Sequence, residues 1–416
     1  MPKVNLKAGV PRIVSAGARN CAILYVASRL PELTETFVYR EMLGLRSANR
    51  TVLGAGVRAA RPGFFDDPVM VHFAREVYVA YSIQTLLTLP MALANHSGVF
   101  AGALNDTFRA DHGNFKERAK HLLQALAGIG LGWRCRNQGV RHVHAHMAHV
   151  PATVALYAAR TLGAGFSFTG HAADLFVQRS GLRFKLEQAD FVACISLWHR
   201  GFYNEVLSLP LEKTPIVRCS VALPNEHNEV RKEIVVVARL IRKKGIDLLI
   251  HAFAEANLPQ WRLRIIGEGP ERRSLERLAL ETGSGERISF EGARPHPYCL
   301  DAISHAGMFA LPCRTALDGD RDGIPVVLME AMAAARPVIS GDLPSIRDLV
   351  SDGTTGILVR PDRVDDLISA IERIAGDEGL AMALGAKARE HVASEFSDEV
   401  NLARLENAFD NARMLA

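Results

Sequence analysis

The sequence predicts an α/β protein made of two Rossmann-like, doubly wound domains that face each other across a cleft. The chain has 416 residues, which is too long for one ordinary hydrophobic core, so two domains are expected. Short apolar runs alternate with longer segments of helical periodicity, the pattern of a parallel sheet with helices on both faces. A polar, proline-containing stretch at residues 221–233 interrupts this alternation, which then starts again, so we expect an interdomain linker there.

The first half of the chain begins with an expected strand at residues 21–28 (CAILYVAS), followed by an amphipathic helix at residues 35–48. A second helical pattern, PATVALYAARTLG, occupies residues 151–163. Around it, short apolar runs that end in a polar residue predict further strands. These runs are HVHAHM, FSFTGH and DFVACIS, at residues 142–147, 166–171 and 190–196.

The second half shows the same rhythm without repeating the first half in sequence. Its expected strands are IVVVARL, WRLRIIGEG, RISFEG, GMFALP and RPVIS, with helical patterns between them. Ligands of doubly wound sheets bind at the carboxyl ends of the strands. The polar residues that follow these strands are therefore the first candidates for a binding site.

Composition and charge exclude several classes of function. The net charge of +4 and the pI near 8.7 suit a phosphate-bearing ligand or an anionic membrane surface, but are too weak to indicate nucleic acid. Six scattered cysteines without a C-x-x-C pair favour reduced thiols over a disulfide framework or a zinc site. No signal peptide is recognisable before Cys21, and Pro90 and polar residues interrupt the apolar region at residues 77–104. We therefore expect a cytoplasmic protein, soluble or peripheral at the inner face of the membrane.

Residues 105–141 form a basic segment around the apolar run HLLQALAGIGLGW. Two interpretations remain open: an amphipathic helix that faces a membrane, or a solvated helix packed on the sheet. The basic residues are Arg109, Lys116, Arg118, Lys120, Arg134, Arg136 and Arg141.

Two cations follow the first expected strand of the second half. Arg239 lies at the end of that strand, and Lys244 comes five residues later, before a glycine and a helix. Cations in these positions suit a diphosphate, although two surface cations would give the same pattern. After the next strand, Gly267 and Gly269 resemble half of a dinucleotide fingerprint, but Arg272 occupies the place of its third glycine. These glycines indicate only that backbone approaches something closely.

The stretch DGDRDGIPVVLME at residues 318–330 resembles a calcium-binding loop but has the wrong spacing. Six residues separate Gly323 from Glu330, where an EF-hand has five, and Pro325 lacks the backbone N–H that paired loops use. Pro325 instead fits the first turn of a helix, whose free N–H groups can bind an anion. Asp322 and Glu330 can both accept hydrogen bonds from hydroxyl groups of one ligand. This combination predicts a nucleotide-sugar site.

Histidines provide the candidates in the first half. His171 follows a glycine at a strand end, a position more typical of a functional than of a core histidine, and Asp174 comes one turn later. His142, His144 and His146 would share one face of a strand, but no acidic or cysteine ligand accompanies them in the sequence. We therefore expect no metal at this row of histidines.

Together these motifs resemble the retaining glycosyltransferases of family 4, which have the two-domain GT-B fold, and among them the bacterial exopolysaccharide enzymes of the colanic-acid type. The resemblance covers nearly the whole chain, from SRLPELTETFVYREM through FSFTGHAADLF and VARLIRKKGIDLLIHAFA to DGDRDGIPVVLMEAMAAARPVIS. The last segment carries the family's E-x7-E motif as Asp322-x7-Glu330. Each piece is weak alone, and their combination is specific.

The resemblance implies a domain organisation. Residues 1–225 would form the acceptor-binding domain and residues 226–389 the nucleotide-sugar-binding domain, and the final helices, at about 390–416, would pack back on the first. The loop at Pro31–Thr34 would approach the phosphates. No cofactor and no metal are implied, and the partners would be a nucleotide-sugar donor and a lipid-linked or oligosaccharide acceptor.

The resemblance also assigns roles to residues. Glu330 would hold the ribose hydroxyls, Arg239 and Lys244 would neutralise the diphosphate leaving group, and Asp322 would hold the donor sugar. His171 would lie near the reacting centre. With the two glycines above, the expected donor-binding residues are Gly267, Gly269, Asp322, Gly323, Ile324, Pro325, Val326, Val327 and Glu330.

The expected reaction is transfer of a hexose from a UDP- or GDP-sugar to a hydroxyl group, with retention of configuration. A GT-B-type epimerase or phosphorylase, and a non-catalytic sugar-nucleotide-binding partner of a biosynthetic complex, remain alternatives. The sequence departs from the family pattern at Asp322, where glutamate is usual, and at Ser345 and Arg347, where relatives often have glycine and proline. These departures bear on the identity of the donor.

Overall fold

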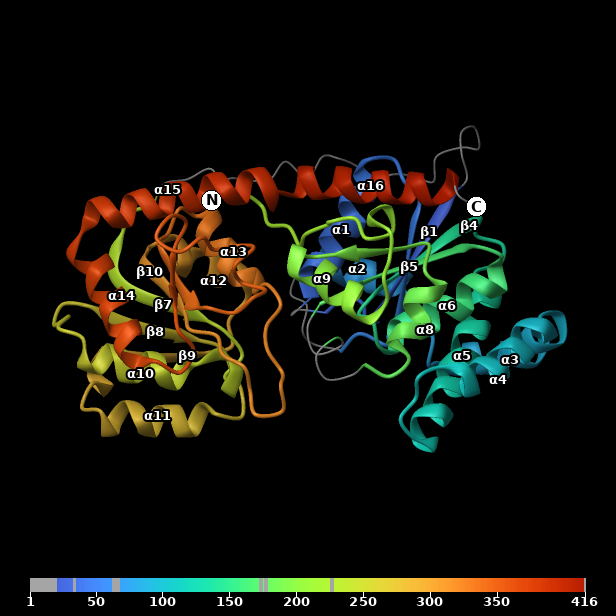
Figure 1. Cartoon of the computed structure of the whole chain (residues 1–416), viewed down its shortest axis with the longest axis horizontal. Helices are drawn as coiled ribbons and strands as arrows, with labels where there is room; N and C mark the ends of the chain where they lie inside the picture. The colour runs from blue at the N-terminus through green and yellow to red at the C-terminus, as the bar shows by residue number, and fades with distance from the viewer. Residues whose placement is uncertain are drawn as a thin grey trace.

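The computed structural model describes residues 21–32, 35–61, 68–171, 175, 179–224 and 228–414. The described chain forms two six-stranded sheets, each surrounded by helices, and all strand pairs within them are parallel (Figure 1). The predicted fold class, two doubly wound α/β domains, is confirmed. Asp174 and the second half of the predicted loop at Pro31–Thr34 lie outside the described residues.

The first sheet has the strand order β3-β2-β1-β4-β5-β6. The chain moves outwards from β1 to β3 and then returns to β4 on the other side of β1, so the switch point of the topology lies between β1 and β4. The side chains of β1 are buried along nearly its whole length, as expected for a central strand. The strands are β1 Ala22–Arg29, β2 Val52–Arg58, β3 Tyr78–Val79, β4 Val140–His146, β5 Gly165–Gly170 and β6 Phe191–Cys194.

The helices of the first domain cover both faces of this sheet. Helix α6 is buried almost all round because it lies between the sheet and helix α5. Gly128 and Gly132 of α5 permit this contact. A Cβ atom on Gly128 would lie 2.4 Å from the carbonyl oxygen of Val154, and one on Gly132 would lie 2.8 Å from that of Ala158. The helices are α1 Thr36–Ser47, α2 Pro68–Glu76, α3 Ile83–Asn95, α4 Ser97–Arg109, α5 Phe115–Cys135, α6 Val150–Leu162, α8 Leu182–Gln188 and α9 Leu197–Val206.

The second sheet has the order β12-β11-β10-β7-β8-β9, which places its switch point between β7 and β10. Its strands are β7 Arg231–Val237, β8 Arg262–Ile266, β9 Ile288–Gly292, β10 Ala306–Leu311, β11 Val338–Gly341 and β12 Ile357–Val359. Its helices are α10 Ile246–Glu255, α11 Arg272–Glu281, α12 His296–Ser304, α13 Val326–Ala333, α14 Val364–Gly376 and α15 Glu378–Glu395, with a 3-10 turn η3 at Arg242–Lys244.

The last helix, α16 (Asp398–Met414), extends from the second domain along the first (Figure 1). Phe409 and Leu405 of α16 are buried in the same core cluster as Ile23 and Phe191 of the first sheet. Helix α15 packs against α13 in the second domain, so α15 and α16 together join both domains. Within the described residues, no helix is both long and apolar enough to cross a membrane.

Candidate functional site

The candidate site of the second domain is formed by two segments that leave the sheet on either side of its switch point. The segment after β7 carries Arg239 and Lys244, and the segment after β10 carries Asp322. Because β7 and β10 are neighbouring parallel strands, both segments begin at the same edge of the sheet. The structure therefore brings together residues that are 78 positions apart in the sequence.

Two lysines hold the carboxylate of Asp322. The Nζ atom of Lys244 lies 2.7 Å from Oδ2, and that of Lys243 lies 3.4 Å from Oδ1. Lys243 also pairs with Asp320 at 3.0 Å, and the thiol of Cys313 donates to Oδ2 of Asp322 at 3.2 Å. Lys243 was missed from the sequence, because a run of two lysines does not show which one points inwards. Cys313 was also missed, as one of six scattered cysteines.

The two main charges of this cluster stabilise each other. Burial opposes the ionisation of Asp322, but the charges of Lys244 and Lys243 outweigh it and hold the pKa of Asp322 below its usual value. Burial likewise opposes the charge of Lys244, and Asp322 outweighs it, so the pKa of Lys244 is raised. Both groups are therefore charged at neutral pH. Arg239 is exposed and lies apart from this cluster, on the wall of a cleft shared with the first domain.

Gly267 and Gly269 support the segment that carries Arg239. A Cβ atom on Gly267 would lie 1.8 Å from the carbonyl oxygen of Ala238, and one on Gly269 would lie 2.3 Å from that of Leu240. The close approach that these glycines indicated is thus an approach of the chain's own backbone. They position the loop after β7.

Helix α13 begins one residue later than the sequence indicated. Val326 is its first residue, and Pro325 is the N-cap residue rather than part of the first turn. The N–H groups of the first turn have no partner within the helix and make its N-terminus electropositive. Ile324 is buried, whereas Val326 and Val327 are half-buried on the first turn.

Glu330 lies on the second turn of α13 and is buried. His296, at the start of α12, contacts its Oε1 atom through Nε2 at 2.7 Å. This histidine was missed from the sequence, because no local pattern links the first turn of α12 to α13. The pair fixes the orientation of the Glu330 carboxylate.

The first domain reaches this site through His171, the residue after β5. A Cβ atom on Gly323 would lie 2.4 Å from the carbonyl oxygen of His171, so only glycine permits this approach between the domains. The imidazole of His171 is buried, with Nε2 at 3.1 Å from Nδ1 of His146 and Nδ1 at 3.7 Å from Sγ of Cys219. Burial, followed by the proximity of His146 and His199, lowers the pKa of His171 well below its usual value, so the ring is neutral at pH 7.

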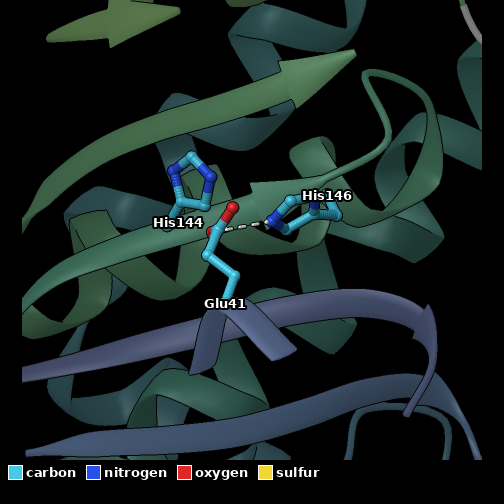
Figure 2. A group of neighbouring side chains, drawn as sticks. All are labelled: Glu41, His144 and His146. Carbon is cyan, nitrogen blue, oxygen red and sulfur yellow. Dashed lines mark hydrogen bonds and ion pairs between the residues drawn. The ribbon is translucent and has the colours of Figure 1, made fainter. Parts of the chain in front are cut away.

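A chain of hydrogen bonds continues from His171 into the first domain. His146 contacts Oε1 of Glu41 through Nε2 at 3.1 Å (Figure 2). The hydroxyl of Tyr25 donates to the same oxygen at 2.6 Å. A carboxylate only accepts, so Nε2 of His146 carries the proton and Nδ1 accepts from Nε2 of His171. Nδ1 of His171 then accepts from Cys219. Both ring nitrogens of His171 therefore bond to protein atoms.

The prediction that no acidic group accompanies the row of histidines is wrong. Glu41 comes from α1, and its carboxylate lies with His144 and His146 in a group whose ligand atoms are within 4.8 Å of one another (Figure 2). The nitrogens of His144 contact the hydroxyls of Ser167 at 2.7 Å and Thr169 at 3.1 Å. Since these nitrogens and those of His146 already have hydrogen-bond partners, we interpret the group as a hydrogen-bond network.

Comparison with known proteins identifies the class of the second domain. Residues 223–391 match the family model of "Glycosyl transferases group 1". The described architecture also matches solved structures over nearly its whole length. A lipopolysaccharide outer core galactosyltransferase, WaaB, aligns with a TM-score of 0.66 at 16% identity, covering 94% of this chain and 99% of that one. HepE of Anabaena, in complex with UDP-glucose, aligns with a TM-score of 0.69 at 14% identity, covering 94% and 99%.

The chain therefore has the GT-B fold, and its residues 223–391 form a glycosyl transferases group 1 domain. Three curated relatives each match less than half of the chain. An exopolysaccharide phosphotransferase of Streptomyces coelicolor is 34% identical over 43% of this chain, and a putative colanic acid biosynthesis glycosyltransferase, WcaL, of Salmonella typhimurium is 33% identical over 46%. A GDP-mannose-dependent mannosyltransferase of Mycolicibacterium smegmatis, which acts on phosphatidylinositol monomannoside, is 32% identical over 44%. The chain spans 18%, 50% and 49% of these relatives, respectively.

Proposed function

We propose that the protein is a retaining glycosyltransferase that moves a hexose from a UDP- or GDP-sugar to a hydroxyl of a lipid-linked or polysaccharide acceptor in the synthesis of a cell-surface glycan. One observation carries the proposal: the lysine–aspartate cluster at the switch point of the group 1 domain, next to the N-terminus of α13 and in reach of the first domain through Gly323. Cations, a helix N-terminus and buried carboxylates at one strand edge suit a ligand with both phosphates and hydroxyls.

The chemistry requires stabilisation of a departing diphosphate. The bond between the anomeric carbon and the diphosphate oxygen breaks, a bond to the acceptor oxygen forms on the same face of the sugar, and the acceptor proton passes to the leaving phosphate. Lys244, Arg239 and the start of α13 supply positive charge where negative charge develops, so the reaction proceeds without a metal. Lys244 exchanges Asp322 for a phosphate oxygen when the donor binds.

The relatives suggest two classes of donor, a GDP-sugar and a UDP-sugar. Mannosyltransferases named for GDP-mannose match this chain in sequence, whereas HepE was solved with UDP-glucose. Thermal stabilisation by UDP, GDP and ADP separates these donors, because a ligand at 100 times its Kd adds about 2.7 kcal/mol to the free energy of unfolding. We expect UDP or GDP to stabilise the protein and the other nucleotides to do so less.

A test of the reaction needs an acceptor. Release of nucleoside diphosphate that increases with added acceptor, together with a new α-linked product from an α-linked donor, is the expected result. Interconversion of the nucleotide sugar without an acceptor indicates an epimerase, and release that depends on free phosphate indicates a phosphorylase. Tight nucleotide binding with no turnover on any acceptor favours the non-catalytic alternative.

We also propose that the first domain rests on an anionic membrane surface. Figure 1 shows α3, α4 and α5 together at the outer side of this domain. Helix α3 contains no charged residue, and the first turns of α5 carry Lys116, Arg118 and Lys120. The second half of α5 is buried against α6, as the packed-helix interpretation expects, so only its beginning is available. The large apolar side chains exposed on the three helices are Ile83, Leu86, Leu87, Met91, Leu104, Phe108, Phe115 and Leu123.

Liposome sedimentation tests this membrane contact. Exposed apolar side chains beside cations favour insertion into an anionic interface, and the charge contribution falls with salt. We expect binding to anionic vesicles that weakens with salt and with Lys116, Arg118 and Lys120 changed to glutamine. Equal sedimentation with neutral and anionic vesicles would contradict the proposal.

A further inference from the structure

A cleft of about 740 Å³ lies at the carboxyl ends of the first four strands of the first sheet. Arg29 ends β1, Arg58 ends β2, Tyr81 follows β3 and His149 follows β4, and all four residues line the cleft. This edge contains the switch point between β1 and β4, where doubly wound sheets bind ligands. The cleft is therefore the counterpart, in the first domain, of the lysine–aspartate site in the second.

The charge of this cleft is strongly positive. Five cations line it against two carboxylates. Arg58, Arg61 and Lys120 form no ion pair with any residue that the structure describes. Like charges that converge on one cleft repel each other, and an anionic ligand removes this repulsion. The cations are Arg29, Arg58, Arg61, Lys120 and Arg239, and the carboxylates are Glu32 and Glu35.

A helix N-terminus adds to this field. Helix α6 begins at Val150, which lines the cleft together with the N-cap residue His149, and no side chain caps its first N–H groups. The helix has 13 residues, so its dipole is well developed. Pro151, the second residue of the helix, has no N–H, so Val150 and Ala152 carry the N–H groups of its first positions. Such N–H groups, arginine and lysine are the groups that bind phosphate oxygens.

The outer wall of the cleft is apolar. Leu123 of α5 and Tyr81 line it and are 63% and 44% exposed. Beyond them, α3 exposes its first residue, Ile83, which is 73% accessible and follows Tyr81 by two positions. A ligand that fills this cleft therefore meets cations at the strand ends and hydrocarbon at the rim.

We propose that this cleft binds the phosphate group of an acceptor in which phosphate is attached to a hydrocarbon chain, at a site separate from that of the donor diphosphate. The inference rests on the proposed function and selects the lipid-linked acceptor over a neutral polysaccharide. Arg58 and Lys120 hold the phosphate oxygens, and Leu123 contacts the first part of the chain. Arg239, which reaches the cleft from the second domain, lies between the acceptor phosphate and the donor phosphates and reduces their repulsion.

The test uses the full chain saturated with the nucleoside diphosphate that stabilises it most, so that the donor site is filled. Geranyl diphosphate, inorganic pyrophosphate and geraniol are titrated by calorimetry below the micelle concentration of the lipid. We expect geranyl diphosphate to bind beside the nucleotide, pyrophosphate to bind more weakly, and geraniol not to bind. Arg58→Gln and Lys120→Gln should each weaken geranyl diphosphate by at least about 10-fold, since each removes a charged hydrogen bond.

The matched control is Arg141→Gln. Arg141 is an exposed arginine at the amino end of β4, on the opposite edge of the same sheet. Its substitution should change the affinity for geranyl diphosphate by no more than about 2-fold. All variants should bind the nucleotide like the unmodified chain and keep its melting temperature. Displacement of the nucleotide by geranyl diphosphate, the absence of binding, or equal effects of Arg141→Gln and Arg58→Gln would overturn the inference. Pyrophosphate binding as tightly as geranyl diphosphate would overturn the choice of a lipid-linked source. Failure of every nucleotide to bind would instead refute the proposed function, and geranyl diphosphate would then be titrated alone.

Discussion

The two domains share one strand order but organise charge at their switch points in opposite ways. In the second domain, Lys243 and Lys244 are paired with Asp320 and Asp322, and the cluster is internally neutral. In the first domain, no carboxylate of the described part of the chain forms an ion pair with the cations of the cleft, while the histidines of β4 are buried in a hydrogen-bond network. The same fold thus carries one site whose lysines and aspartates neutralise each other and one site with an excess of positive charge.

This difference has a physical consequence for binding. A ligand anion at the second-domain site must replace a carboxylate, so it gains specificity for geometry more than raw electrostatic affinity. A ligand anion in the first-domain cleft is attracted by cations that no described carboxylate neutralises, and salt screens this attraction. We therefore expect salt to weaken acceptor binding more than nucleotide binding.

The largest effect is expected for Lys244→Met. This change leaves the buried carboxylate of Asp322 with the longer contact to Lys243 and the thiol of Cys313, and removing one partner of a buried ion pair costs about 3–5 kcal/mol. Activity should also fall by at least about 100-fold, because the leaving diphosphate loses a cation. Denaturant unfolding and nucleotide release measure the two effects. The matched change Lys243→Met should destabilise less, and a larger effect of Lys243→Met would reverse the order of the two lysines.

The next prediction separates the two acids of the motif. Glu330→Gln should weaken the free nucleoside diphosphate by about 10- to 100-fold, because it removes a charged acceptor for the ribose. Asp322→Asn should leave that affinity unchanged or raise it, since it releases Lys244 and Lys243 for the phosphates, and should lower turnover of the sugar donor. Calorimetry with nucleotide and nucleotide sugar on both variants decides this. Loss of nucleotide affinity in Asp322→Asn would show that the lysines need Asp322 to hold their positions.

The contrast between the domains also shows what the sequence could predict. The doubly wound fold followed from β1 and its successors, because buried strands and helical periods are local patterns. Strand β2 was not predicted, since Gly54 and Gly56 interrupt its apolar run, and a Cβ atom on Gly56 would lie 2.6 Å from the carbonyl oxygen of Arg58. A glycine required by a close approach of backbone weakens the local signal of a strand.

Asp322 and Lys244 were expected because they follow strand ends, whereas two of the missed residues, Glu41 and His296, lie on helices. Asp322 and Lys244 both follow strands, and the structure places them 2.7 Å apart. Glu41 lies in the middle of an amphipathic helix, 105 residues from His146, and nothing in that helical pattern marks it as the partner of a histidine. The separate roles given to Asp322 and Lys244 stay a prediction, and their ion pair shows that the two roles are coupled.

Acid should weaken the first domain before the second. Burial lowers the pKa values of His112, His121, His144 and His171, all in the first domain, and that of His121 is lowered to about 4. As the pH falls below about 6.5, the unfolded chain binds protons that the folded chain does not, so stability falls by up to about 1.4 kcal/mol per pH unit for each histidine. For His121 this loss continues down to about pH 4.

Hydrogen exchange resolved by domain measures this effect. Amides of the first sheet should lose protection between pH 7 and pH 5, and His121→Asn should reduce the loss. His121 contacts the hydroxyl of Tyr157 at 3.0 Å, and asparagine can keep a hydrogen bond there without a titrating group. A slope with pH that is the same in His121→Asn and in the unmodified chain would rule out His121 as a source.

A smaller effect is expected for Glu41→Gln. The amide can still accept from one donor, but it no longer fixes the tautomer of His146 by charge, so His171 loses a defined partner. We expect kcat to fall by about 10-fold with the KM for the donor unchanged, because Glu41 acts through two histidines and does not touch the ligand. Tyr25→Phe removes only the second hydrogen bond to Glu41 and should have a weaker effect in the same direction. An increase in KM with unchanged kcat would place the network in donor binding instead.

No effect is expected from a chelator, and this expectation tests both domains at once. A divalent cation would need free carboxylate oxygens, yet Asp320 and Asp322 are held by lysines, and the nitrogens of His144 and His146 are engaged with hydroxyls, Glu41 and His171. EDTA should therefore leave activity and melting temperature unchanged after dialysis, and added Ca²⁺, Mn²⁺ or Zn²⁺ should not raise either. Loss of activity that Ca²⁺ or Mn²⁺ restores, and that Asp320→Asn reproduces, would place a metal in the second-domain cluster. Loss of melting temperature that Zn²⁺ restores, and that Glu41→Gln reproduces, would place one among the histidines of the first.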